Sequence, residues 1–102
     1  MLSLGSQAIF YYNDPVDMRK GFNGLSDLVA ESFPGKLLSG AIFIFLNKRC
    51  NLIKIIYWDY DGLALWYKRL EKGTFKALAR GNIEITRQEF SLILGYYSAL
   101  LA

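Results

Sequence analysis

The sequence predicts an α+β fold, in which an antiparallel sheet of three to five strands forms a meander and two helices pack on one face. Three apolar segments rich in β-branched and aromatic residues follow one another between residues 40 and 70, separated by short turn sequences. Two further segments, one on each side, carry apolar residues at helical spacing. The length of 102 residues suits one domain, so residues 1–102 are expected to fold as a single unit.

The first expected elements are a short strand and a helix. Ala8 to Tyr12 is rich in aromatic residues and predicts the strand. Asp14 is a suitable N-cap and Pro15 suits the first helical position, so the helix is expected to begin there and to stop before Pro34. Apolar residues recur on one face of this helix at Met18, Phe22, Leu25 and Val29.

Three strands and a second helix are expected to follow. The strands are residues 40–47, 52–58 and 63–70, joined by the loop "NKRCN" and the turn "DYDG". A short strand in "IEITRQEF" leads to Thr86 and Glu89, which have the spacing of a capping box. The second helix is expected from about residue 87 to 101, and its apolar side consists of Phe90, Ile93, Leu94, Tyr97 and Leu101.

The turn "DYDG" determines which side chains share a face of the second hairpin. A three-residue loop with Gly62 as a bulge would pair Lys54 with Lys68. A two-residue turn that uses Gly62 would pair Lys54 with Arg69 instead. The first register gathers basic and aromatic side chains on one face, namely Lys54, Ile56, Trp58, Ala64, Trp66 and Lys68.

A sheet face of this composition has two interpretations. If the face is exposed, its indole rings can stack on bases while lysines contact phosphates, as on single-strand nucleic-acid platforms. If a helix covers the face, the indoles belong to the core and the lysines extend outward over them. The pattern alone leaves both interpretations open.

Charge is distributed unevenly along the chain. Residues 48–80 contain eight basic and three acidic residues, a net charge of +5, whereas the remainder has four basic and six acidic residues. Such a basic part indicates an anionic partner, although a solvated lysine-rich surface gives the same pattern. Lys48 and Arg49 lie at a hairpin tip. Arg19 and Lys20 lie near the expected helix start, where they either pair with Asp14 or Asp17 or contact phosphate.

Several classes of protein are excluded by composition. The chain has no histidine and one cysteine, which removes histidine-based catalysis and a structural zinc site within one chain. Asp59 and Asp61 at a hairpin tip are interpreted as turn formers rather than as metal ligands, and a nuclease that uses them with Glu71 is the least favoured hypothesis. No apolar stretch approaches the ~20 residues that span a bilayer, and no signal peptide is expected. We therefore expect a cytoplasmic protein that is not an enzyme and uses no cofactor, metal or membrane.

Two stretches resemble a known family. They are "PVDMRKGFNGL" at residues 15–25 and "SGAIFIFLNKRCNLIKIIYWDYDGLALWYKRLEKGTF" at residues 39–75. Both are similar to the product of the second open reading frame of IS66-type insertion sequences, and the similarity continues more loosely through "IEITRQEFSLIL". Cys50 stands where that family often has an arginine, so the loop is less basic here. The matching positions that bear on binding are Arg19, Lys20, Arg49, Lys54, Trp58, Trp66, Lys68 and Arg69.

The resemblance implies an accessory role in transposition beside a separate, larger transposase, without a known catalytic activity. We therefore expect a non-catalytic accessory protein that binds DNA or the transposase–DNA complex through a basic–aromatic sheet face. The alternative is a protein-interaction module that docks on the transposase or self-associates as a homo-oligomer, without direct DNA contact. The residues expected to contact nucleic acid are Arg19, Lys20, Lys48, Arg49, Lys54, Trp58, Trp66, Lys68 and Arg69.

Overall fold

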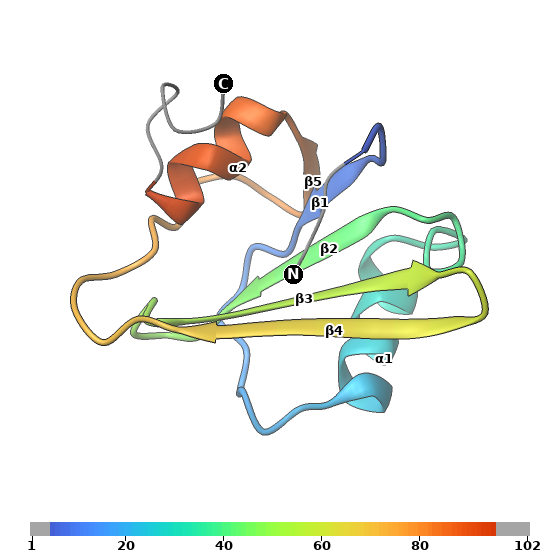
Figure 1. Ribbon diagram of the computed structural model, residues 1–102, viewed down its shortest axis with the longest axis horizontal. Coiled ribbons are helices and arrows are strands. Elements are labelled where there is room, and N and C mark those ends of the chain that lie inside the picture. The colour runs from blue at the N-terminus through green and yellow to red at the C-terminus, as the bar shows by residue number, and fades with distance from the viewer. Residues whose placement is uncertain (1–4, 96–102) are drawn as a thin grey trace.

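A computed structural model describes residues 5–95, which form one five-stranded sheet and two helices. The order across the sheet is β4-β3-β2-β1-β5 (Figure 1). The predicted α+β class is confirmed, and so is the antiparallel meander of β2, β3 and β4. The elements are β1 (Ile9–Tyr11), α1 (Phe22–Ser32), β2 (Ile42–Leu46), β3 (Leu52–Asp59), β4 (Gly62–Arg69), β5 (Ile83–Ile85) and α2 (Arg87–Leu94).

The prediction of a wholly antiparallel sheet is wrong at one pair of strands. β1 runs parallel to β2, with Ile9 opposite Ile42, and β5 pairs antiparallel with the other edge of β1. α1 forms the long crossover that a parallel pair requires. The strand patterns predicted pairing between neighbours in sequence, and they carried no signal that β1 would lie between β2 and β5.

The two helices cover opposite faces of the sheet, so the prediction that both pack on one face is also wrong. α1 buries Leu25 and Val29 in one apolar cluster, whereas α2 buries Phe90 and Ile93 in a second, separate cluster. Figure 1 shows α1 behind β3 and β4, and α2 near β1 and β5. Successive side chains of a strand point to opposite faces. Because every residue of Ile42–Leu46 is apolar and buried, β2 needs a cover on both sides.

α1 begins at Phe22, later than predicted, and Asp14 does not cap it. The N–H of Val16 donates to a carbonyl at the end of β2 at 2.9 Å, which holds the preceding segment against the sheet. The carboxylate of Asp17 accepts the backbone N–H of Arg19 at 2.9 Å and closes a local turn. Such side-chain-to-backbone bonds compete with helix formation, which explains the late start. The helix does end before the proline, as predicted.

The capping box predicted for α2 is confirmed. The hydroxyl of Thr86 accepts the backbone N–H of Glu89 at 3.1 Å, and the Glu89 carboxylate accepts the backbone N–H of Thr86 at 2.9 Å. α2 ends where Gly95 adopts a left-handed conformation with φ of 76°, a common way of terminating a helix. The expected continuation through Tyr97 and Leu101 lies outside the described residues. Neither helix has the length and apolar character needed to span a membrane.

The β3–β4 hairpin adopts neither of the two registers considered. Asp59 pairs with Gly62, so the turn consists of Tyr60 and Asp61. The N–H of Asp61 donates to the carbonyl of Asp59 at 2.6 Å, and Tyr60 has a left-handed backbone with φ of 57°. Both predictions assumed that glycine would supply the left-handed residue, because glycine does so without steric cost. The use of Tyr60 shifts the pairing by one residue and changes the composition of both faces.

Candidate nucleic-acid interface

The observed register places the two tryptophans on opposite faces of the sheet. Trp58 lies opposite Leu63 on the face that α1 covers, and Trp66 lies opposite Ile55 on the face that α2 covers. Both indoles are half-buried. The predicted basic–aromatic face that would combine Lys54, Trp58, Trp66 and Lys68 is therefore wrong, because the observed register places the two β4 residues on the face opposite to the two β3 residues.

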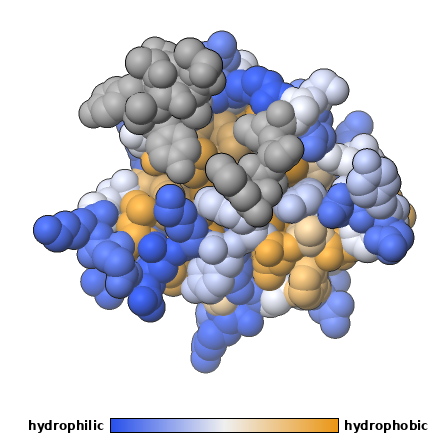
Figure 2. Space-filling model, viewed as in Figure 1, coloured by the Kyte–Doolittle hydropathy of each residue, from blue (hydrophilic) through white to orange (hydrophobic). Residues whose placement is uncertain are grey.

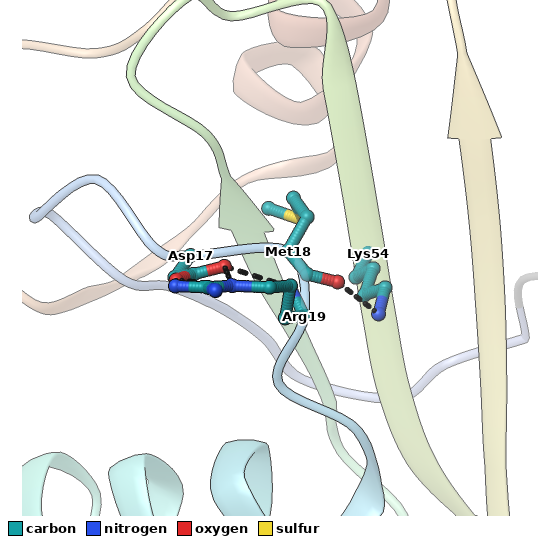
Figure 3. A network of polar contacts seen from close by, with 4 residues as sticks. All are labelled: Asp17, Met18, Arg19 and Lys54. Carbon is teal, nitrogen blue, oxygen red and sulfur yellow. Dashed lines mark hydrogen bonds and ion pairs between the residues drawn. The ribbon is translucent and has the colours of Figure 1, made fainter.

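Lys54 lies inside the molecule and holds backbone in place. Its residue surface is 7% exposed. The ammonium donates to the carbonyl oxygens of Met18 and Lys20, each at 2.8 Å, and lies 4.6 Å from the centre of the Tyr67 ring. Figure 3 shows the Met18 carbonyl directed at Lys54. The ammonium group was expected to contact phosphate, but it is already bound by two backbone carbonyls and lies near an aromatic ring. Lys54 therefore positions the segment before α1.

Three of the predicted cations meet at the end of the sheet where β2 ends and β3 begins. Arg19 comes from the segment before α1, and Lys48 and Arg49 come from the β2–β3 loop. All three line one open hollow of about 520 Å³. We call these three residues the basic cluster. The hollow is also lined by Val16, Asp17, Met18, Asn47 and Leu52.

Hydrogen bonds within the β2–β3 loop hold the cations of the loop outward. The side-chain oxygen of Asn47 accepts the backbone N–H of Asn51 at 3.0 Å, and its amide donates to the Asn51 side chain at 2.8 Å. Cys50 adopts a left-handed backbone with φ of 56° and donates its N–H to the Asn47 carbonyl. Lys48 and Arg49 are therefore exposed at the tip of a fixed turn. Asn47 was not among the predicted site residues, although its position at the end of an apolar strand was an available signal.

Arg19 forms an ion pair with Asp17 at the rim of the hollow. Two guanidinium nitrogens of Arg19 donate to the Asp17 carboxylate, the shorter distance being 2.6 Å (Figure 3). The side chain of Arg19 is nevertheless 91% exposed. The hydrogen bond from the Arg19 side chain, followed by that from its backbone N–H, lowers the pKa of Asp17 from 3.8 to about 2. The pairing anticipated from the sequence is present, and the guanidinium still faces solvent.

The ion pair predicts a measurable acid titration. In the unaltered protein, the carboxyl carbon of Asp17 should titrate in NMR spectra with a pKa of about 2, and Arg19→Gln should return it toward 3.8. Because the folded-state pKa lies below the ordinary value, this contact stabilises the protein fully above pH 3.8, and the contribution is lost as pH falls through about 2. Arg87→Gln, at an exposed position on α2, is the matched control and should leave the Asp17 titration unchanged. Titration of the unaltered protein near 3.8 would contradict the ion pair.

The remaining predicted residues on β4 are divided between the two faces. Arg69 lies opposite Leu52, a lining residue of the hollow, and pairs at the surface with Glu71 at 3.0 Å. Lys68 lies opposite Ile53 on the other face. Figure 2 shows hydrophilic side chains gathered at the left, where β4 ends in the view of Figure 1. Neither residue lines the hollow, and Lys68 lies on the face away from Arg69.

In the part of the chain that the structure describes, the carboxylates and the lone thiol are not grouped as metal ligands. Asp59 and Asp61 are exposed at the hairpin turn. Cys50 is a free, partly buried thiol. Within residues 5–95, no group of three or more histidine, cysteine or carboxylate side chains is placed to hold a metal ion.

Together, the fold and the basic cluster define a small α+β protein in which three cations line an open hollow at one end of the sheet. The chain belongs to the IS66 Orf2-like protein family, whose model matches residues 7–98. The family resemblance of the sequence is therefore confirmed, and membership connects the chain with transposition as an accessory protein.

Two curated relatives are similar over most of the chain. Uncharacterized protein y4jC of Sinorhizobium fredii is 39% identical over 88 residues, which cover 84% of this chain and 75% of the relative. Uncharacterized protein y4hO of the same organism is 35% identical over 80 residues, covering 76% of this chain and 70% of the relative. No solved structure matches the chain.

Proposed function

We propose that the protein is a non-catalytic accessory protein of IS66-type transposition that binds the backbone of DNA through the basic cluster. The observation that carries this proposal is the meeting of Arg19 with Lys48 and Arg49 around one hollow, although the two segments are far apart in sequence. Arginine and lysine side chains are the commonest contacts to phosphate oxygens. Family membership supplies the transposition context.

The proposed contact surface differs from the one that the sequence pattern suggested. Lys54 is left out because its ammonium already has two carbonyl acceptors, and the two tryptophans are left out because they face opposite sides of the sheet. Lys68 is left out because it lies on the face away from the hollow. The proposed phosphate contacts are the three residues of the basic cluster, Arg19, Lys48 and Arg49.

A double substitution in the β2–β3 loop tests this proposal. Fluorescence anisotropy would measure binding to single-stranded and duplex oligonucleotides that carry the ends of an IS66-type element, at two or more salt concentrations. Lys48→Gln with Arg49→Gln should weaken binding at least tenfold. On duplex DNA, it should also reduce the slope of log affinity against log salt by about 2, because about 0.9 counterion is released per phosphate contact.

The matched control removes one lysine charge and one arginine charge from positions outside the hollow. Lys36→Gln with Arg87→Gln changes one lysine and one arginine outside the hollow, both exposed, and should leave the salt slope nearly unchanged. Equal loss in both double variants would show that overall charge, rather than the basic cluster, causes binding. Failure of the unaltered protein to bind any oligonucleotide, together with co-purification with the transposase without DNA, would favour the protein-docking alternative.

A further inference from the structure

β4 forms a long edge of the sheet. It has eight residues, contains no proline, and within the described part of the chain nothing pairs with its outer side. None of its residues is fully buried, and Tyr67 is 51% exposed. The opposite edge, β5, has only three residues and carries an exposed charge at Glu84. Long edge strands are templates for pairing with another chain, and the charged residues of β4, Lys68 and Arg69, are confined to its last two positions.

The hydrogen bonds of the hairpin determine which backbone groups point outward. The N–H of Leu70 donates to the carbonyl of Asn51 at 2.8 Å, so the backbone groups of residue 70 point toward β3. In an antiparallel ladder this direction alternates from one residue to the next. The backbone groups that point away from the sheet therefore belong to Leu63, Leu65, Tyr67 and Arg69.

We infer that β4 pairs antiparallel with β4 of a second copy of this chain. Two-fold symmetry requires paired residues to lie on the same face, and the symmetric register centred on Leu65 meets this condition. Leu63 of one copy then lies opposite Tyr67 of the other, so the apolar row on the α1 face continues across the interface. The exposed Tyr67 ring gains an apolar neighbour in this arrangement.

Charge complementarity favours a second copy of this chain as the partner that pairs with the outer edge of β4. In the register centred on Leu65, Asp61 of each copy lies opposite Arg69 of the other, which gives two equivalent acid–base pairs at the two ends of the interface. Arg69 also contacts Glu71 of its own chain at 3.0 Å, but the Arg69 side chain remains 66% exposed. One hairpin thus carries an acidic turn at one end and a cation at the other, an arrangement that favours antiparallel self-pairing.

The dimer should be weak and dependent on concentration, because the self-pairing of one eight-residue strand buries less than the ~1,200 Å² typical of stable interfaces. Sedimentation velocity of the full chain without DNA measures it directly. Asp61→Lys places two cations opposite each other at both ends, and Arg69→Glu places two carboxylates there. Each single variant should raise the dissociation constant of the dimer at least tenfold.

Mixing the two variants provides the decisive measurement. In a heterodimer, Lys at position 61 of one copy faces Glu at position 69 of the other, while the native Asp61 and Arg69 face each other at the second end. The equimolar mixture should therefore recover dimerisation. Glu84→Lys on the opposite edge strand and Arg87→Glu on α2 are the matched controls, and they should leave the dissociation constant unchanged. A monomeric unaltered protein, or a mixture no stronger than the single variants, would overturn the inference. Neither result depends on DNA binding.

Discussion

Replacing Lys54 with methionine is expected to lower the free energy of unfolding by about 3 kcal/mol. The ammonium donates two hydrogen bonds to the carbonyl oxygens of Met18 and Lys20 within the buried part of the molecule. Methionine fills the volume of the aliphatic stem but donates no hydrogen bond, so both carbonyls lose their donor. The loss should lower the melting temperature by roughly 10–20 °C in a domain of this size. Urea and thermal unfolding followed by circular dichroism would measure both quantities.

A matched substitution separates this effect from a general loss of charge. Lys48→Met removes the same ammonium group from an exposed loop and should change the free energy of unfolding by no more than about 0.5 kcal/mol. Lys54→Met should also accelerate hydrogen exchange at the N–H of Lys20, which donates to the carbonyl of Asp17 at 3.1 Å in the segment that Lys54 holds. If both variants unfolded at the same urea concentration as the unaltered protein, Lys54 would not have the positioning role.

Phe43→Ala is the second substitution with a large expected effect, a loss of about 3–5 kcal/mol. The ring of Phe43 is fully buried and lies 5.5 Å from the ring of Phe10 on β1 and 5.7 Å from that of Phe33 at the end of α1. Alanine would leave a cavity where β1, β2 and α1 meet. The free energy of unfolding from urea titrations gives the loss, provided that refolding is reversible.

Phe22→Ala is the control for Phe43→Ala, because the same atoms are removed from a side chain that is 47% exposed. It should cost about 1 kcal/mol or less. Similar losses in the two variants would mean that the junction of β1, β2 and α1 collapses around the missing ring, or that Phe43 is not central to the core.

Local signals were sufficient to predict most elements. The strands of the meander follow from short apolar segments bounded by turn residues, and the start of α2 follows from a threonine and a glutamate at capping-box spacing. Each of these features depends on residues that are close in sequence. The beginning of α1 was mispredicted because Asp17 bonds to the backbone N–H of Arg19 instead of stabilising a first helical turn.

The hairpin register could not be predicted, and much of the predicted interface depended on it. A left-handed tyrosine at position 60 is uncommon, so glycine-based turns were the reasonable expectation. The shift of one residue moved Lys54 and Lys68 onto opposite faces. A lysine within the apolar sequence "LIKIIYW" was the available sign that this charge is buried.

The three residues of the basic cluster were among those expected to contact nucleic acid, but their proximity to one another was not predicted. The charge imbalance indicated an anionic partner, and Lys48 and Arg49 were expected at a hairpin tip. The position of Arg19 beside them results from the contact between the segment before α1 and the end of β2, a long-range contact that no local pattern encodes. The basic cluster therefore contains three of the predicted cations and none of the predicted residues of β3 and β4.

The place of β1 in the sheet also constrains the order in which the chain can fold. The meander of β2, β3 and β4 contains only pairings between neighbouring strands, so it can form as soon as residues 42–69 are available. β1 is made first, but its outer edge is closed only by β5 at Ile83–Ile85. The N–H of Asn13 donates to the side-chain oxygen of Asn82 at 2.7 Å, so this hydrogen bond also cannot form until residue 82 has been synthesised. During synthesis on the ribosome, β1 is therefore the first strand to be made but should be the last to have both of its edges paired.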